Sequence, residues 1–181
     1  MEFFNTTVRN YISSSVSLNK NFSFEQFKVG RSNITYKIND EKNVYVLRRP
    51  PFGEKLESAH NMQREYKILE ELHKNQIKVP EPILLCTNRK ISDEDFYIME
   101  YIEGETISDN IIASKYLPDE KKSITTSFIK SLAELHDFDV LNSALSDLGK
   151  HEKYVERQIN RWNKQFNSQK IREINDLTVA T

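Results

Sequence analysis

The pattern of apolar and polar residues divides the chain into strand-like segments, all of them before Gly104, and helical segments, which lie on both sides of it. A short N-terminal segment with apolar residues on one side comes first. Three stretches rich in aromatic and β-branched residues follow, and each ends at a turn signal. Connections this short favour antiparallel hairpins over crossovers. We therefore expect a helix within residues 1–19 and strands at 22–29, 33–39 and 43–49.

A further helix is predicted over residues 60–72, where apolar side chains recur at helical spacing. Ser58 precedes this segment and is a suitable N-cap. Glu65 falls near the centre of the apolar face, although other charged residues of the same segment lie on its polar side. A buried carboxylate is costly unless a cation pairs with it. The position of Glu65 therefore predicts a basic partner.

The remaining pattern predicts two more strands and then helices. The strands are expected at 83–86 and 95–102, and the helices from Pro118 to the "HDFD" that begins at His136 and over about 151–170. The order of these elements predicts an α+β fold: a five-stranded antiparallel sheet crossed by one helix and followed by helical structure. The last helix carries one apolar face, which needs burial by further structure, a partner or self-association. Its residues are Val155, Ile159, Trp162 and Phe166.

Composition narrows the range of functions. The chain has 181 residues with 26 basic and 27 acidic side chains, so its net charge of -1 predicts binding neither to nucleic acid nor to anionic membranes. The single cysteine, Cys86, allows neither an intrachain disulfide nor a metal site built on thiolates. The N-terminus lacks the pattern of a secretory leader, and no apolar run approaches the roughly 18 residues of a membrane span. We expect a cytoplasmic protein.

The strand expected at 43–49 offers a partner for Glu65. Side chains alternate along a strand, so Val46 and Arg48 share one face, and a helix packed on that face brings Glu65 against Arg48. Kinases use a basic residue of the third strand, paired to an acidic residue of the next helix, to hold nucleotide phosphates. Two other interpretations remain open: a purely structural ion pair, or a glutamate whose carboxylate reaches water.

Two other segments carry weaker signals of nucleotide binding. The strand "FYIMEYIEG" ends in an extended segment that is suited to contact a base through backbone groups. The stretch "VGRSNITYKI" joins two strands through a polar turn with a single glycine, as a phosphate-covering hairpin does. Taken in order with "YVLRRPPFG", "NMQREYKILEEL" and "VPEPILLC", these segments resemble the aminoglycoside phosphotransferase-like kinase family. The resemblance covers roughly residues 24–165 and is closest to the branch associated with acyl-CoA dehydrogenases.

The resemblance implies a protein-kinase-like fold, with a nucleotide-binding small lobe over residues 1–103 and a linker and the first helices of a large lobe over 104–181. It implies an ATP-dependent phosphotransferase that acts on the hydroxyl of a small molecule, and the backbone contacts of the hinge suit GTP as well as ATP. Arg48 matches the phosphate-binding cation and Glu65 its helix partner. The other implied cofactor-binding residues are Ser32 and Asn33 beside the phosphates, Val46 against the base, and the backbones of Glu100 and Ile102 at the adenine.

Two departures from the family limit this expectation. Arg48 stands where many phosphotransferases have lysine, although arginine also grips phosphate. None of the four histidines begins the family's His-Gly-Asp-x4-Asn catalytic loop. The nearest imitation starts at His136, which is better explained as the last turn of a helix. We therefore predict no catalytic residue in this chain.

The missing loop suggests an N-terminal fragment of a kinase, with little turnover of its own. Mg²⁺ and the hydroxylated acceptor are expected only with the missing large lobe. The alternative is a non-catalytic short protein that binds nucleotide or a partner through its small lobe, with self-association through the Trp162 helix face.

Overall fold

The computed structural model describes residues 3–27, 33–53, 60–149 and 152–169. The chain folds into two compact units, Met1–Leu145 and Ser146–Thr181. The first unit contains the sheet and most of the helices, and the second contains the last helix. The lobe boundary that the sequence suggests near residue 103 stays a prediction. No helix within the described ranges is long and apolar enough to cross a membrane.

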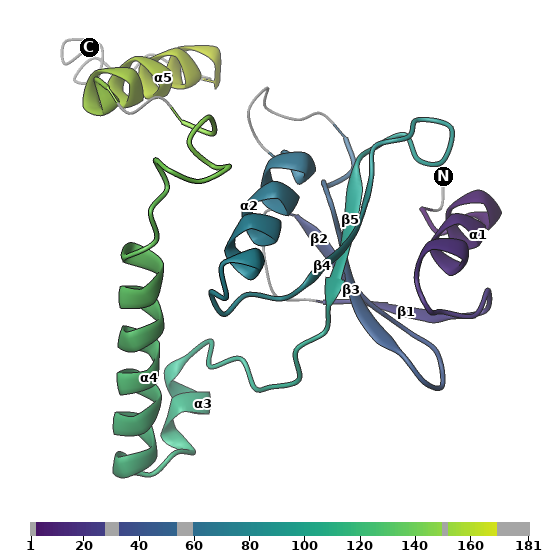
Figure 1. Cartoon of the computed structure of the whole chain (residues 1–181), viewed down its shortest axis with the longest axis horizontal. Coiled ribbons are helices and arrows are strands. Elements are labelled where there is room, and N and C mark those ends of the chain that lie inside the picture. The colour runs from purple at the N-terminus through teal and green to yellow at the C-terminus, as the bar shows by residue number, and fades with distance from the viewer. Residues whose placement is uncertain (1–2, 28–32, 54–59, 150–151, 170–181) are drawn as a thin grey trace. The chain divides into compact units, whose positions relative to one another are not determined.

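The first unit is built on a five-stranded sheet in which every neighbouring pair is antiparallel (Figure 1). The strand order is β1-β2-β3-β5-β4, so the first three strands form consecutive hairpins and β5 lies between β3 and β4. This arrangement confirms the predicted α+β fold. The strands are β1 (Ser23–Gln26), β2 (Ile34–Asn39), β3 (Val44–Arg49), β4 (Pro82–Cys86) and β5 (Phe96–Glu100).

Two helices pack against opposite faces of this sheet (Figure 1). Helix α1 (Thr6–Ser15) shares the main hydrophobic core with Leu47 of β3 and Ile98 of β5, which are cross-strand partners and fully buried. Helix α2 (Met62–Lys74) contacts β4 and β5 on the other face. Successive side chains of a strand point to opposite faces. Arg48 therefore faces α2, whereas its neighbours on β3, Leu47 and Arg49, face α1.

Most element boundaries differ from the predicted ones, by up to five residues at one end of α1, because caps and pairing partners set them. The expected cap of α2, Ser58, lies outside the described residues, and the observed cap is Asn61, whose side chain accepts a hydrogen bond from the Arg64 amide at 2.9 Å. Strand β1 ends at Gln26 within the described residues, and β5 ends at Glu100, two residues earlier than predicted.

Helices follow the sheet, as predicted, with one addition. Helix α4 (Pro118–His136) has the predicted bounds and leaves its apolar stripe mostly exposed, with Phe128 64% accessible. Helix α5 (Tyr154–Gln169) forms the described part of the second unit. The addition is α3 (Asn110–Ser114), whose Asp109 cap accepts hydrogen bonds from two backbone amides.

Candidate functional site

The predicted ion pair between the sheet and the helix is present. Arg48 of β3 donates from Nε to Oε2 of Glu65 on α2 at 2.8 Å. Strand alternation directs Arg48 toward α2, and Glu65 lies in the first turn of that helix, close to its N-terminus. The two positions that were paired on sequence grounds therefore meet.

Burial of this pair is lower than expected. Both side chains are 32% exposed, so Glu65 is not the core carboxylate that its helical position suggested. Glu65 lies in the first turn of α2, three residues after Met62, which is buried. Exposed ion pairs contribute only about 0.2–1 kcal/mol to stability. The ion pair by itself therefore adds little to the stability of the fold.

Glu65 is held by two further donors besides Arg48. Asn33 donates from Nδ2 to Oε1 at 2.7 Å, and the Tyr97 hydroxyl donates to Oε2 at 3.1 Å. Tyr97 lies on β5 directly opposite Arg48, so the sheet register places the Arg48 and Tyr97 side chains on the face that α2 covers. Burial, with the Glu65 carboxylate as the next cause, raises the pKa of Tyr97 well above its ordinary value, and the phenol stays a donor. The carboxylate is thereby fixed from three sides.

The network extends to β2 and to the residue before the α2 cap. Arg48 donates from Nη1 to Thr35 Oγ1 at 3.3 Å, and these residues are cross-strand partners on β3 and β2. His60, whose φ is 64°, is hydrogen-bonded through Nδ1 to Oδ1 of Asn33. Because a carboxylate only accepts, Nδ2 of Asn33 faces Glu65 and its Oδ1 faces His60. Nδ1 of His60 is therefore the donor in this contact, and Oδ1 of Asn33 accepts.

Sequence reasoning missed Thr35, His60 and Tyr97 as members of this network. Alternation along the β5 segment shows which residues share a face with Tyr97. The contact between Tyr97 and Glu65 can be predicted only when the β3–β5 register is also known. The sequence does not predict the contact of His60 with Asn33, because this contact depends on a left-handed backbone conformation just before α2.

The remaining predicted residues lie along the same strands. Val46 is 7% exposed and shares the Arg48 face of β3. Glu100 pairs with Tyr45 at the far end of the β3–β5 ladder from Tyr97, and its amide donates to the Glu81 carbonyl at 2.8 Å. Ile102 follows the strand and is 58% exposed. The structure thus brings Asn33, Arg48 and Glu65 into contact and leaves the two hinge positions at the other end of β5. Ser32 lies outside the described residues.

Removal of the Asn33 side chain tests the network directly. In Asn33→Ala, we expect a loss of about 1–2 kcal/mol in the free energy of unfolding, because Glu65 and His60 each lose a hydrogen bond. Urea unfolding followed by circular dichroism measures this change. Unchanged stability in Asn33→Ala would show that the two contacts contribute nothing in solution.

The fold and this site define a protein with the small lobe of a kinase: an antiparallel sheet, one helix across it, and a cation on the third strand held by a helix glutamate. The model of the phosphotransferase enzyme family matches residues 23–178, and this chain belongs to that family. The match confirms the resemblance found in the sequence.

Individual relatives agree with this assignment. Acyl-CoA dehydrogenase family member 11 of Rattus norvegicus is 35% identical over 141 residues, which cover 78% of this chain and 18% of that protein. The probable acyl-CoA dehydrogenase IBR3 of Arabidopsis thaliana is 37% identical over 150 residues, with 80% and 18% coverage. A crystal structure of a "putative aminoglycoside phosphotransferase" from Ralstonia eutropha superposes with a TM-score of 0.67 at 28% identity and covers 93% of this chain.

These matches differ in length from the present chain. The chain spans less than a fifth of the curated relatives and 48% of the solved structure. Each alignment therefore concerns one part of a longer protein. Kinase-like phosphotransfer is the activity class that family and fold support.

Proposed function

We propose that this chain is the nucleotide-binding half of an ATP-dependent phosphotransferase that acts on the hydroxyl of a small molecule. The observation that carries the proposal is the Arg48–Glu65 contact of 2.8 Å between β3 and α2. The phosphotransferase family match and the sheet topology support it. A purely structural ion pair explains the contact less well, because a pair this exposed adds little stability.

In this proposal Arg48 binds phosphate oxygens and Glu65 sets the direction of its guanidinium. Nε donates to Glu65 and Nη1 to Thr35, and a guanidinium has five N–H groups, so donors remain for a phosphate. The amide of Asn33 is already engaged by Glu65 and His60. Asn33 therefore acts as a positioning residue through Glu65 rather than through its side chain on phosphate.

The base of the nucleotide is assigned to the other end of β5. The Glu100 amide is used by Glu81, so the groups available to a base are the Glu100 carbonyl and the Ile102 amide, with Val46 against the ring. Backbone groups of this kind can bind adenine or guanine. We therefore propose ATP as the nucleotide, with GTP as the alternative to be compared with it. Ser32 belongs on the phosphate side in this proposal.

The transfer step needs groups that this sequence lacks. In-line attack by a substrate hydroxyl on the γ-phosphorus breaks the bond to the ADP oxygen, and the hydroxyl proton passes to a base. The sequence contains no His-Gly-Asp-x4-Asn segment to supply that base and a metal ligand. We propose that these residues, and the Mg²⁺ that neutralises the phosphates, belong to a large lobe outside this sequence. The names of the relatives favour a hydroxyacyl compound as the acceptor.

Calorimetric titration with ATP, GTP and AMP tests the nucleotide assignment on the chain itself. We expect saturable binding of the triphosphates and weaker binding of AMP, because the Arg48 contact needs the outer phosphates. We also expect no measurable ADP formation by this chain alone. Absence of any nucleotide binding would overturn the proposal.

A second candidate function is suggested by the apolar face of α5. Its Tyr154, Val155, Ile159 and Trp162 side chains are 57–68% exposed within the part of the chain that is described. An apolar face of this kind is typically buried in an interface. A non-catalytic protein that self-associates through this face would show a dimer whose fraction rises with concentration in sedimentation velocity. A monomer at all concentrations would remove this candidate.

A further inference from the structure

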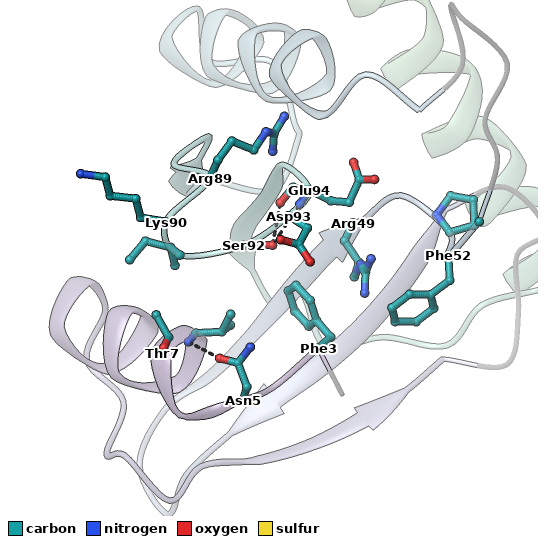
Figure 2. Close-up of a pocket in the computed structure, with 14 residues that line it drawn as sticks. Phe3, Asn5, Thr7, Arg49, Phe52, Arg89, Lys90, Ser92, Asp93 and Glu94 are labelled. Atoms are coloured by element: carbon teal, nitrogen blue, oxygen red, sulfur yellow. Dashed lines mark hydrogen bonds between the residues drawn. The ribbon is translucent and has the colours of Figure 1, made fainter. Parts of the chain in front are cut away.

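A cavity lies on the sheet face opposite the Arg48–Glu65 pair, where α1 packs (Figure 2). Its volume is about 410 Å³, within the range of small-molecule sites. The start of α1, the end of β3 and the hairpin loop between β4 and β5 form its walls. Its apolar lining comes from Phe3, Val8, Pro51, Phe52 and Ile91, and polar or charged residues form the larger part of the wall.

Arg49 places a buried cation in this cavity. The residue is only 3% exposed, and its Nε and Nη1 atoms have no hydrogen-bond partner among the described residues. The rings of Phe52 and Phe3 lie 3.9 and 4.4 Å from the guanidinium carbon, and Figure 2 shows Arg49 between them. Aromatic faces stabilise the charge but cannot accept its N–H bonds in full. Buried donors without acceptors are uncommon in native proteins and require a ligand or another explanation.

The N-terminus of α1, which carries the partial positive charge of the helix dipole, faces the same cavity. Asn5 caps this ten-residue helix, and its side chain accepts the Val8 amide at 3.0 Å. The cap satisfies the Val8 amide. The earlier amides of the first turn, including that of Thr7 in the cavity wall, have no carbonyl acceptor within the helix. A helix N-terminus favours a bound anion.

The other charged residues of the lining restrict the ligand to a single negative charge. Asp93 and Glu94 also line the cavity. Burial lowers the pKa of Arg49, and the nearby Tyr36 and Glu94 oppose this shift only in part. Arg89 is already paired to Asp95 at 2.8 Å, and Figure 2 shows the Lys90 amine directed away from the cavity. One inward cation beside two carboxylates disfavours a polyphosphate. The apolar part of the wall favours a ligand with a hydrocarbon body.

We propose that this cavity binds a small organic monocarboxylate, with its oxygens on Arg49 and the α1 N-terminus and its apolar body against Phe3 and Ile91. Occupancy brings a carboxylate to the guanidinium of Arg49, whose Nε and Nη1 have no hydrogen-bond partner among the described residues. The site is separate from the proposed nucleotide site, because Arg48 and Arg49 are consecutive on β3 and point to opposite faces.

Titration with hexanoate, followed through the arginine Nε–H signals in nitrogen-15 NMR spectra, tests the assignment. We expect one signal to shift saturably and to be missing from Arg49→Gln, which assigns it to Arg49. Calorimetric titration of the two proteins then compares their affinities, and Arg49→Gln should bind hexanoate at least about tenfold more weakly. Lys90→Gln is the matched control, since it removes one positive charge from the same surface without touching the inward cation. It should bind hexanoate like the unmodified chain.

Three results would overturn the proposal: no saturable shift with hexanoate, equal binding by Arg49→Gln, or tighter binding of inorganic phosphate or ATP at this signal. Should Arg49→Gln fail to fold, Phe52→Ala replaces it, because the Phe52 ring is 60% exposed and its removal leaves the core intact. A several-fold weaker hexanoate affinity in Phe52→Ala supports the site, and an unchanged affinity contradicts it.

Discussion

Replacement of Arg48 by alanine is expected to weaken ATP binding by about tenfold to a hundredfold, since hydrogen bonds to charged groups contribute about 1.5–3 kcal/mol. The guanidinium is already oriented by Glu65 at 2.8 Å and by Thr35 at 3.3 Å, so it needs little ordering when phosphate binds. Isothermal titration calorimetry of ATP with Arg48→Ala and with the unmodified chain measures the change.

Lys42→Ala is the matched control for Arg48→Ala. Lys42 is an exposed cation in the turn between β2 and β3, at the far end of β3 from Arg48. Its removal changes the net charge equally and should leave ATP affinity unchanged within about twofold. Equal weakening by both variants would mean that overall charge, and not the positioned guanidinium, determines the affinity.

Glu65→Ala separates the functional explanation of the pair from the structural one. We expect weaker ATP binding in the same direction as Arg48→Ala, because the guanidinium loses its orienting carboxylate. The cost in unfolding free energy should be about 1–3 kcal/mol. Water replaces the partner of the one-third exposed Arg48, but Asn33 and the buried Tyr97 hydroxyl lose their acceptor as well. A large loss of stability with unchanged ATP affinity would favour a structural ion pair. Urea unfolding and calorimetry on the same preparation give both quantities.

The fold could be predicted from the sequence to the level of elements and their pairing. Short turns between three strand-like segments leave little choice except hairpins, and the observed order β1-β2-β3 follows from that. Element ends were less predictable. Asn61 rather than Ser58 caps α2, and both residues have side chains suited to a cap, so the choice depends on where the loop directs the chain. The five residues of α3 are too few to show a helical period.

The candidate site could be predicted as far as local periodicity reaches. Strand alternation placed Arg48 on the helix-facing side, and helical spacing placed Glu65 against the sheet. Tyr97 and Thr35 join through cross-strand register, which a single sequence does not show before the pairing is known. The expected burial was wrong for a related reason. Helical spacing gives the direction of a side chain around the helix axis, but not whether the sheet extends far enough to cover it.

The burial of Arg49 could not be predicted from local periodicity either. Alternation places it on the face opposite Arg48, yet nothing in "LRRPP" indicates that it is the buried member of the pair. Its burial depends on Phe3, which precedes α1, and on Phe52, which follows β3. Strand alternation therefore puts the two arginines on opposite faces, and the packing of Phe3 and Phe52 on the α1 side buries Arg49.

The same packing makes Phe96→Ala the most damaging core substitution that we expect. Phe96 of β5 is 0% exposed, and its ring centroid lies 5.5 Å from that of Phe3 and 6.4 Å from that of Tyr11. Truncation removes a large apolar side chain and leaves a cavity between the sheet and α1, at a cost of about 3–5 kcal/mol. Urea unfolding monitored by far-ultraviolet circular dichroism measures the loss. The matched control is Phe128→Ala on α4, where the ring is 64% exposed and the cost should stay below about 0.5 kcal/mol. Similar stabilities for the two variants would show that α1 does not pack on β5 in solution, and the enclosed position of Arg49 would then lose its support as well.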